Sequence, residues 1–358
     1  MTGSGDILVS HDDGVSTITM NRPAALNALT WRMVQRLSLQ LAAWRDDPGV
    51  AAVLVKAAPG RAFCAGGDIR AVTDLVREQG VTAATAFFRE EYRLNWRIHT
   101  FPKPYLAVLD GITMGGGVGI SVHGSHRVVT ERTLLAMPET GIGFIPDVGA
   151  TWFLPRCPGA VGMYLGLTGA RLNGADTLAA GLGTHAVPAA RLAELEDMLA
   201  VELRPDKAQG VVTACLGALA DGIGPTELPQ LRPSIDACFG ADSTAEIFRR
   251  LEADPGEFAA EQLAALATKS PLAVALTFAQ LKRGRSLSIE DALRLEYRVV
   301  HRLLAGHDFH EGVRALLIDK DRRPRWRHRD VAAVPGQEVE ACLAPLPEGE
   351  LVLDWHGL

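Results

Sequence analysis

The stretch Asp110–Gly124, "DGITMGGGVGISVHG", removes the side chain at four closely spaced positions directly after an apolar run. Gly115, Gly116 and Gly117 are consecutive, and Gly119 follows after Val118. A Gly-rich turn between a strand and a helix lets a ligand approach free backbone N–H groups. The pattern is compatible with tight packing without a ligand, with a phosphate site or with an oxyanion site.

The details required of a nucleotide site are missing. A dinucleotide-binding turn belongs in the first βα unit, whereas this cluster follows at least three β-like runs, and a P-loop would need G-K-[ST]. A second strand-exit loop lies in "GRAFCAGGDI", where Ala65, Gly66 and Gly67 precede Asp68. Two such loops can each direct a backbone N–H at one oxygen, which is the geometry that an acyl oxyanion requires. The sequence therefore favours an oxyanion site.

Two carboxylates stand in the Pro/Gly-rich stretch "AMPETGIGFIPDVGATWFLPR", namely Glu139 and Asp147. A carboxylate between apolar residues is costly to desolvate unless it has a partner or a use. Capping of a local turn is the alternative explanation for each, and the bare sequence leaves it open.

The first half of the chain predicts an α/β core. "ILVSHDDGVSTITM" indicates a hairpin, and "VAAVLVKAA" and "PYLAVLDG" are apolar enough for strands covered on both faces. Helical patterns separate these runs, the first of them with Thr30 as its N-cap. Residues 189–260 are mostly helical in pattern, with residues 221–233 predicted as a Pro-rich connection. Residues 288–318 predict two helices, the first capped by Ser288.

Composition limits the function. The 358-residue chain has 47% hydrophobic residues and a net charge of −6, which argues against nucleic-acid binding. Five scattered cysteines predict reduced thiols. We find no signal-like N-terminus and no run near the ~18 apolar residues of a membrane span, and so expect a soluble, cytoplasmic protein without a membrane partner.

"NRPAALNALT", "GRAFCAGGDI", "GITMGGGVGISVHG" and "AMPETGIGFIPDVGA" resemble the successive signatures of the crotonase, or enoyl-CoA hydratase/isomerase, superfamily. The similarity is closest to its 3-hydroxyisobutyryl-CoA hydrolase branch, and it covers nearly the whole chain. It implies an α/β fold with a spiral of ββα turns, followed by a helical C-terminal region. We expect residues 1–200 to form the core with the acyl-CoA site, and residues 201–358 to pack on it or on a neighbouring subunit.

The resemblance also implies site residues. Catalysis is assigned to Glu139 and Asp147, and the oxyanion N–H groups to Ala65 and Gly116. The other substrate-binding positions are Glu91, Gly66, Gly67, Asp68 and Gly115.

The carboxylates distinguish the reactions of the superfamily. Hydratases use two glutamates, of which the first falls on Gly119 here and is therefore missing, while the second falls on Glu139. Asp147 stands where hydratases usually have glycine. We therefore predict hydrolysis of a short-chain 3-hydroxyacyl-CoA thioester. The substrate that we expect first is 3-hydroxyisobutyryl-CoA, a compound of valine catabolism. Glu139 acts either as a nucleophile that forms a mixed anhydride or as a general base for water.

Two other functions stay open: an enoyl-CoA hydratase or isomerase, and a non-catalytic acyl-CoA-binding protein. No metal is expected, because His307 and His310 have no evident third ligand, and no cofactor is needed beyond the coenzyme A of the substrate. Cys64 has no paired histidine and is predicted to pack. The charged run "DKDRRPRWRHRD" is typical of a solvated face, and a share of its charges, with Lys282 and Arg283, is predicted to offset the phosphates of coenzyme A. Superfamily members often form homo-oligomers, but the longer C-terminal region leaves this state open.

Overall fold

The computed structural model describes residues 5–12, 14–204 and 207–355. The strands are β1 (Ile7–Asp12), β2 (Val15–Met20), β3 (Ala52–Ala57), β4 (Ala62–Cys64), β5 (Tyr105–Leu109), β6 (Ile112–Met114), β7 (His126–Val129), β8 (Leu134–Ala136), β9 (Leu172–Asn173) and β10 (His185–Ala186). The first-half helices are α1 (Trp31–Arg45), α2 (Ile69–Gln79), α3 (Val81–His99), α4 (Gly116–Val122), α5 (Ala150–Phe153), α6 (Val161–Thr168) and α7 (Gly174–Ala179).

The later helices are α8 (Leu192–Glu202), α9 (Ala208–Leu219), α10 (Leu228–Phe239), α11 (Thr244–Ala253), α12 (Glu257–Ala267), α13 (Pro271–Gly284), α14 (Ile289–Leu304), α15 (His307–Val313) and α16 (Gly336–Leu343). Short helical turns complete the chain, among them η2 (Glu139–Ile142) and the π-helical η6 (Arg314–Ile318).

The strands form two sheets, one in the order β1-β2-β3-β5-β7-β10 and one in the order β4-β6-β8-β9. Among the described strands, only the β1–β2 and β8–β9 pairs are antiparallel. From β3 onward the chain places one strand in the large sheet, the next in the small sheet and then a helix, as in β3-β4-α2 and β5-β6-α4. The predicted spiral of ββα turns is confirmed.

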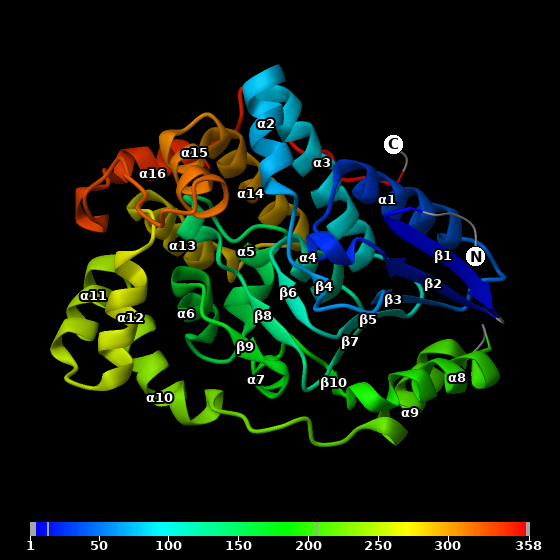
Figure 1. The fold of residues 1–358 in the computed structure, drawn as a ribbon. Coiled ribbons are helices and arrows are strands. Elements are labelled where there is room, and N and C mark those ends of the chain that lie inside the picture. Colours follow the sequence, from blue (N-terminus) through cyan, green and yellow to red (C-terminus); the bar gives the residue numbers. More distant parts are fainter. Residues whose placement is uncertain (1–4, 13, 205–206, 356–358) are drawn as a thin grey trace.

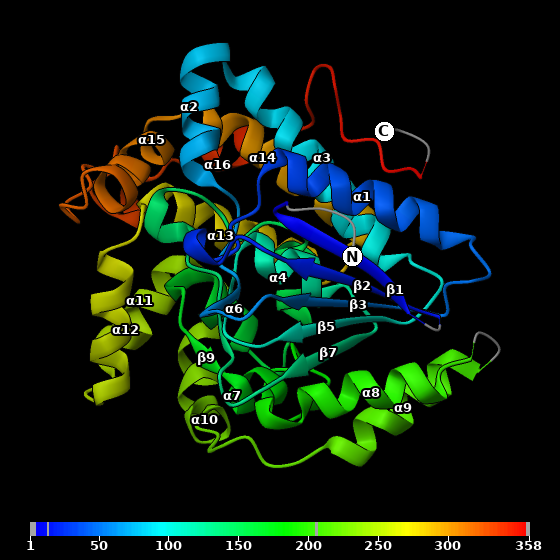
Figure 2. The ribbon, with the colours of Figure 1, turned by 45° about the vertical axis from the view of Figure 1, so that its right-hand side comes forward.

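Both faces of the large sheet are covered, because alternate side chains of each strand point to opposite sides. Val53 and Val55 belong to the main core, which includes residues of α1 and α3. Leu54 belongs to a second core with residues of α8 and α9. Figures 1 and 2 show these two layers, with α1 and α3 on one face of the sheet and the green pair α8–α9 on the other.

The predicted helix starts are confirmed at two caps. The Thr30 side chain accepts a hydrogen bond from the backbone of Met33, and that of Ser288 accepts one from Asp291. The prediction that residues 221–233 form only a connection is wrong, since α10 already begins at Leu228. A proline in the first helical turn needs no N–H partner, and the apolar face of α10 is buried, which stabilises a Pro-containing helix.

The C-terminal helices pack against the first half of the chain beside α5 and α6, since α13 contacts both of these helices and α14 contacts α5 (Figure 1). The predicted division at residue 200 falls inside α8, and the division itself stays a prediction. Within the described ranges, no single helix has both the length and the apolar character to cross a membrane. By these two measures alone, α12 and α13 would qualify as a bent pair, with 114° between them.

Candidate active site

A cavity of about 730 Å³ opens where β4 and β6 end. These strands are parallel neighbours, so the loop after Cys64 and the turn after Met114 emerge side by side. All nine predicted site residues line this cavity: Ala65, Gly66, Gly67, Asp68, Glu91, Gly115, Gly116, Glu139 and Asp147. Leu316, Leu317 and Lys320 line it too, so the C-terminal region of the chain closes over the chain's own cavity.

The clustered glycines make room for specific neighbours. A Cβ on Gly115 would lie 2.9 Å from Glu139 Oε1, and one on Gly116 would lie 2.5 Å from Glu91 Oε1. Farther along, a Cβ on Gly117 would lie 2.1 Å from the Cys64 carbonyl oxygen. Two glycines thus admit carboxylates next to the turn, and the third allows α4 to pack against the end of β4.

Gly119, the position of the missing hydratase glutamate, is closely packed. A Cβ there would lie 2.7 Å from Val148 Cβ and 2.8 Å from the Asn95 side-chain nitrogen. This space is filled by the loop that carries Asp147, so a longer side chain at residue 119 does not fit beside it.

The backbone N–H groups of the two loops differ in whether they already donate a hydrogen bond within the protein. The N–H of Ala65 donates to the Leu26 carbonyl at 3.0 Å. Among the described groups, no acceptor lies within hydrogen-bond reach of the N–H of Gly67 or of Gly116. These two residues are adjacent, because a Cβ on Gly116 would lie 3.3 Å from Gly67 N. The pair of N–H groups available to a ligand is therefore that of Gly67 and Gly116.

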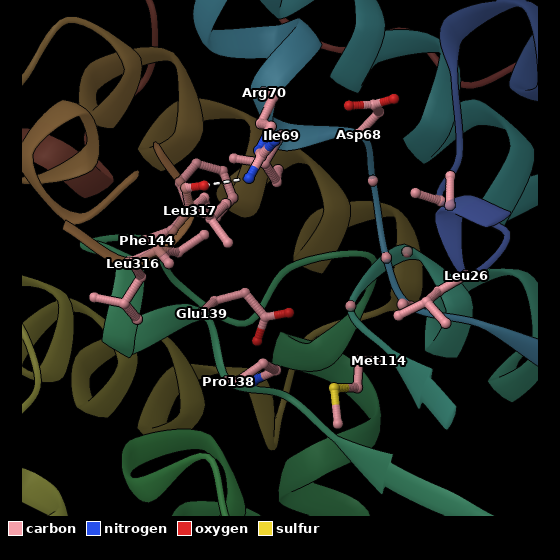
Figure 3. Close-up of a pocket in the computed structure, with 18 of the residues that line it drawn as sticks. Leu26, Asp68, Ile69, Arg70, Met114, Pro138, Glu139, Phe144, Leu316 and Leu317 are labelled. Carbon is pink, nitrogen blue, oxygen red and sulfur yellow. Dashed lines mark hydrogen bonds between the residues drawn. The ribbon is translucent and has the colours of Figure 1, made fainter. Parts of the chain in front are cut away.

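Three of the carboxylates that line the cavity are buried, and each comes from a different element. Glu91 lies on α3, Glu139 begins η2, and Asp147 lies in the loop before α5; their exposed fractions are only 2%, 7% and 5%. In Figure 3 the carboxylate of Glu139 points into the cavity, whereas that of Asp68 is turned away from Glu139. The Asp68 side chain instead caps α2 and lies 3.4 Å from Arg22.

Burial shifts the pKa values of the three acids upward. Loss of hydration, followed by the charge of Asp147, raises the pKa of both Glu91 and Glu139 well above the usual value. Burial raises the pKa of Asp147 to about 7, and a hydrogen bond donated by the Tyr92 hydroxyl at 2.7 Å opposes this rise. A carboxyl with a pKa near neutrality is suited to proton transfer.

The loop of Asp147 is strained and fixed by residues that sequence reasoning missed. Val148 has a φ of 53°, an uncommon value for a β-branched residue that costs on the order of 1–3 kcal/mol. Its carbonyl accepts a 2.7 Å hydrogen bond from His123 Nε2, so this nitrogen carries the proton. Glu296 accepts a hydrogen bond from the N–H of Gly149, in this loop, and one from the N–H of Thr151, in the first turn of α5. The sequence does contain a signal for Glu296, because it is a charged residue on the apolar face of the helix predicted from residue 288.

Other predicted candidates have local roles. Burial raises the pKa of the Cys64 thiol to about 12, as fits a packing residue, and all five cysteines are free. The rings of His307 and His310 bond to backbone carbonyls, and the described residues contain no group of three or more His, Cys, Asp or Glu side chains placed so that they could hold a metal ion. That no metal binds stays a prediction. Lys282 pairs with Asp242 and Arg283 with Glu340.

Comparison with known proteins gives consistent matches. The model of the family described as enoyl-CoA hydratase/isomerase matches residues 15–343. The mitochondrial 3-hydroxyisobutyryl-CoA hydrolase of Xenopus laevis is 45% identical over 352 residues, which are 98% of this chain and 91% of that protein. Relatives of the same name at 40–44% identity include the human protein.

Two solved structures are similar over almost the full chain. An enoyl-CoA hydratase from Rhodobacter sphaeroides 2.4.1 is 44% identical with a TM-score of 0.90, and the match covers 98% of this chain and 100% of that one. A carnitinyl-CoA dehydratase from Mycobacterium thermoresistibile is 41% identical with a TM-score of 0.91, at 99% and 100% coverage.

The prediction of a cytoplasmic protein is wrong by this comparison, since the curated relatives are named mitochondrial. Free thiols indicate only a compartment that does not oxidise them, and a targeting segment is separate from the fold. The family itself is settled by the match over residues 15–343 and by the near full-length relatives. The chain belongs to the enoyl-CoA hydratase/isomerase family.

Proposed function

We propose that this protein hydrolyses the coenzyme A thioester of a short-chain 3-hydroxy acid, most specifically 3-hydroxyisobutyryl-CoA. The observation that carries the proposal is that two buried carboxylates, Glu139 and Asp147, share one cavity with two available backbone N–H groups. The filled space at Gly119 argues against the hydratase pair of glutamates. The name shared by the curated relatives agrees with this reaction.

In this proposal the thioester carbonyl oxygen accepts hydrogen bonds from the N–H groups of Gly67 and Gly116. The second donor is thus moved from Ala65 to Gly67, because the Ala65 N–H already bonds to Leu26. Donors placed before the reaction begins stabilise the negative charge that develops on the oxygen, and one donor contributes about 3 kcal/mol. The N–H of Ala65 instead holds this loop against Leu26.

The acids supply the remaining chemistry. The Glu139 carboxylate attacks the thioester carbon, the C–S bond breaks, and the coenzyme A thiolate leaves with a proton from Asp147. Water then opens the mixed anhydride while the ionised Asp147 accepts its proton, which restores both acids. Glu91, beside Gly116, contacts the acyl group. The reaction needs no metal and no cofactor other than the substrate's coenzyme A, and all of its residues come from one chain.

The direct test is a panel of acyl-CoA thioesters assayed for free thiol. We expect 3-hydroxyisobutyryl-CoA and 3-hydroxypropionyl-CoA to release coenzyme A faster than unsubstituted acyl-CoAs of the same length, because Asp147 and Glu91 can bind the 3-hydroxyl group. A parallel assay follows the enoyl absorbance of crotonyl-CoA. Rapid loss of that absorbance without thiol release would contradict the hydrolase proposal.

A hydratase is the second candidate, since the two similar structures are those of a hydratase and a dehydratase. The crotonyl-CoA arm of the panel measures this activity. A third outcome, tight acyl-CoA binding with neither thiol release nor enoyl loss, would support the non-catalytic alternative.

The pH dependence of the reaction follows from Asp147. Asp147 must be protonated to supply the proton for the thiolate and ionised to accept one from water, so its pKa of about 7 predicts a kcat that is highest near pH 7 and falls on either side. Tyr92→Phe removes a hydrogen bond that stabilises the charged form, so the pKa should rise and the maximum of kcat should move to higher pH. A pH–kcat profile that is the same in Tyr92→Phe and the wild type would argue against Asp147 as the titrating group.

A further inference from the structure

The chain turns sharply on the C-terminal side of Asp147. Val148 and Gly149 both have positive φ angles, 53° and 90°. Glycine adopts this region freely, whereas a β-branched residue does so only when its surroundings impose it. Position 149 has no room for a side chain, since a Cβ there would lie 2.5 Å from the His123 ring. The conformation of Val148 therefore needs an external cause.

That cause lies about 150 residues farther along the chain, on α14. The Gly149 N–H donates to Glu296 Oε2, and the Thr151 N–H donates to Glu296 Oε1, both at 2.7 Å. The Glu296 side chain is fully buried. The carboxyl group of Glu296 thus fixes the positions of two N–H groups that follow Val148, at the start of α5.

The carbonyl side of the same loop is held by two further buried groups. His123 bonds to the Val148 carbonyl, and the Gln280 side-chain amide donates to the Pro146 carbonyl at 2.7 Å. With both ends of the turn fixed, the Val148 side chain is pressed against Gly119 of α4. Asp147 lies between these anchors, so its direction depends on them.

Glu296 is costly to the folded state. Burial, and then the charge of Asp147, raise the pKa of Glu296 to about 8, although its hydrogen bonds to the loop oppose this rise. An acid that is fully buried close to other acids weakens folding compared with a neutral residue. Its two bonds to a strained turn next to Asp147 indicate what it contributes instead.

We propose that Glu296 is a positioning residue for Asp147. It holds Val148 in the left-handed conformation and thereby directs the Asp147 carboxylate into the cavity. The inference rests on the proposed function for its kinetic consequence, while its structural part, the control of Val148, is independent of the reaction. It also gives the C-terminal helices a part in forming the site of their own chain.

The test is a double-mutant cycle between residues 296 and 148. In Glu296→Gln the amide can accept only one of the two N–H bonds, and its NH₂ group faces the other donor. We expect kcat for 3-hydroxyisobutyryl-CoA to fall about 30-fold, the scale of releasing one strained residue, with KM changed less than about threefold. In a Val148→Gly background the same substitution should cost less than about threefold, because glycine adopts the left-handed conformation unaided.

Asp176 offers a matched control. It is buried and accepts hydrogen bonds from the backbone N–H groups of Glu227 and Leu228 at the start of α10, outside the cavity. Asp176→Ala removes the oxygen that accepts these bonds and should lower the melting temperature without changing kcat. If Glu296→Gln does not fold, Glu296→Asp takes its place, since the shorter side chain cannot reach both donors.

A general loss of stability would lower kcat equally in the two backgrounds, and that result would overturn the proposal. If the wild type releases no coenzyme A from any thioester of the panel, the proposed function fails, and crystal structures of the wild type and Glu296→Gln decide the positioning role. A Val148 that keeps its positive φ in the variant would refute it. A Val148 that relaxes would support it.

Discussion

Glu139→Gln is expected to lower kcat for thioester hydrolysis by about 1,000-fold or more, because the variant loses both a nucleophile and a base. Glutamine keeps the volume of the side chain and its position beside Gly115. Thiol release from 3-hydroxyisobutyryl-CoA measures the effect. A variant that retains more than about a tenth of the wild-type rate would remove Glu139 from the mechanism.

The loss should not come from unfolding. Because the pKa of Glu139 is raised on folding above its usual 4.5, the folded state binds the proton more tightly than the unfolded state. Ionised Glu139 therefore weakens folding progressively as the pH rises above about 4.5. We expect the melting temperature of Glu139→Gln to match or exceed that of the wild type, with a larger difference at pH 8 than at pH 5. A lower melting temperature would show that the activity loss has a structural cause.

Isotope labelling separates the two roles of Glu139. If Glu139 attacks and water opens the anhydride at the glutamyl carbon, multiple turnovers in ¹⁸O water label the Glu139 peptide. A single turnover with excess enzyme then transfers an enzyme oxygen to the acid product. A first-turnover product that takes its new oxygen only from solvent, with an unlabelled peptide and no adduct trapped by hydroxylamine, would make Glu139 a general base.

Gly67→Pro is expected to lower kcat by about 100- to 1,000-fold, the scale of removing one oxyanion donor. Proline has no N–H. The residue before it is Gly66, with a φ of 113°, and a glycine has no Cβ that could clash with the proline ring. Gly67→Ala is the matched control. It keeps the N–H, and its Cβ would meet the Phe87 ring at an ordinary 3.6 Å, so its kcat should stay within about threefold of the wild type.

Both variants must show the melting profile of the wild type before their rates are compared. A folded Gly67→Pro variant with near-normal turnover would exclude the Gly67 N–H as the second oxyanion donor. The donor would then have to be another N–H group of the same loop. An equally large loss in Gly67→Ala would attribute the effect to space in the loop rather than to the N–H group.

Much of the architecture follows from local patterns in the sequence. Apolar runs such as residues 52–57 specify strands covered on both faces, and the caps at Thr30 and Ser288 specify helix starts through contacts three residues away. Gly115, Gly116 and Gly117 indicate close approach to the backbone, because no other residue leaves that space. The position of Glu139 and Asp147 in an apolar stretch makes both candidates for a function, but the stretch by itself fits the capping of a turn equally well.

Other features depend on contacts between distant segments. That the Ala65 N–H is engaged, whereas those of Gly67 and Gly116 are available, follows from how the loop lies against Leu26. The left-handed turn at Val148 depends on Glu296, which lies some 150 residues later on a helix whose pattern gives only its burial. Sequence determines which residues can adopt a strand, a cap or a tight turn, since these are local properties. Which N–H stays available, and where Asp147 points, is decided by tertiary packing, because both depend on hydrogen bonds that form only after separate elements meet.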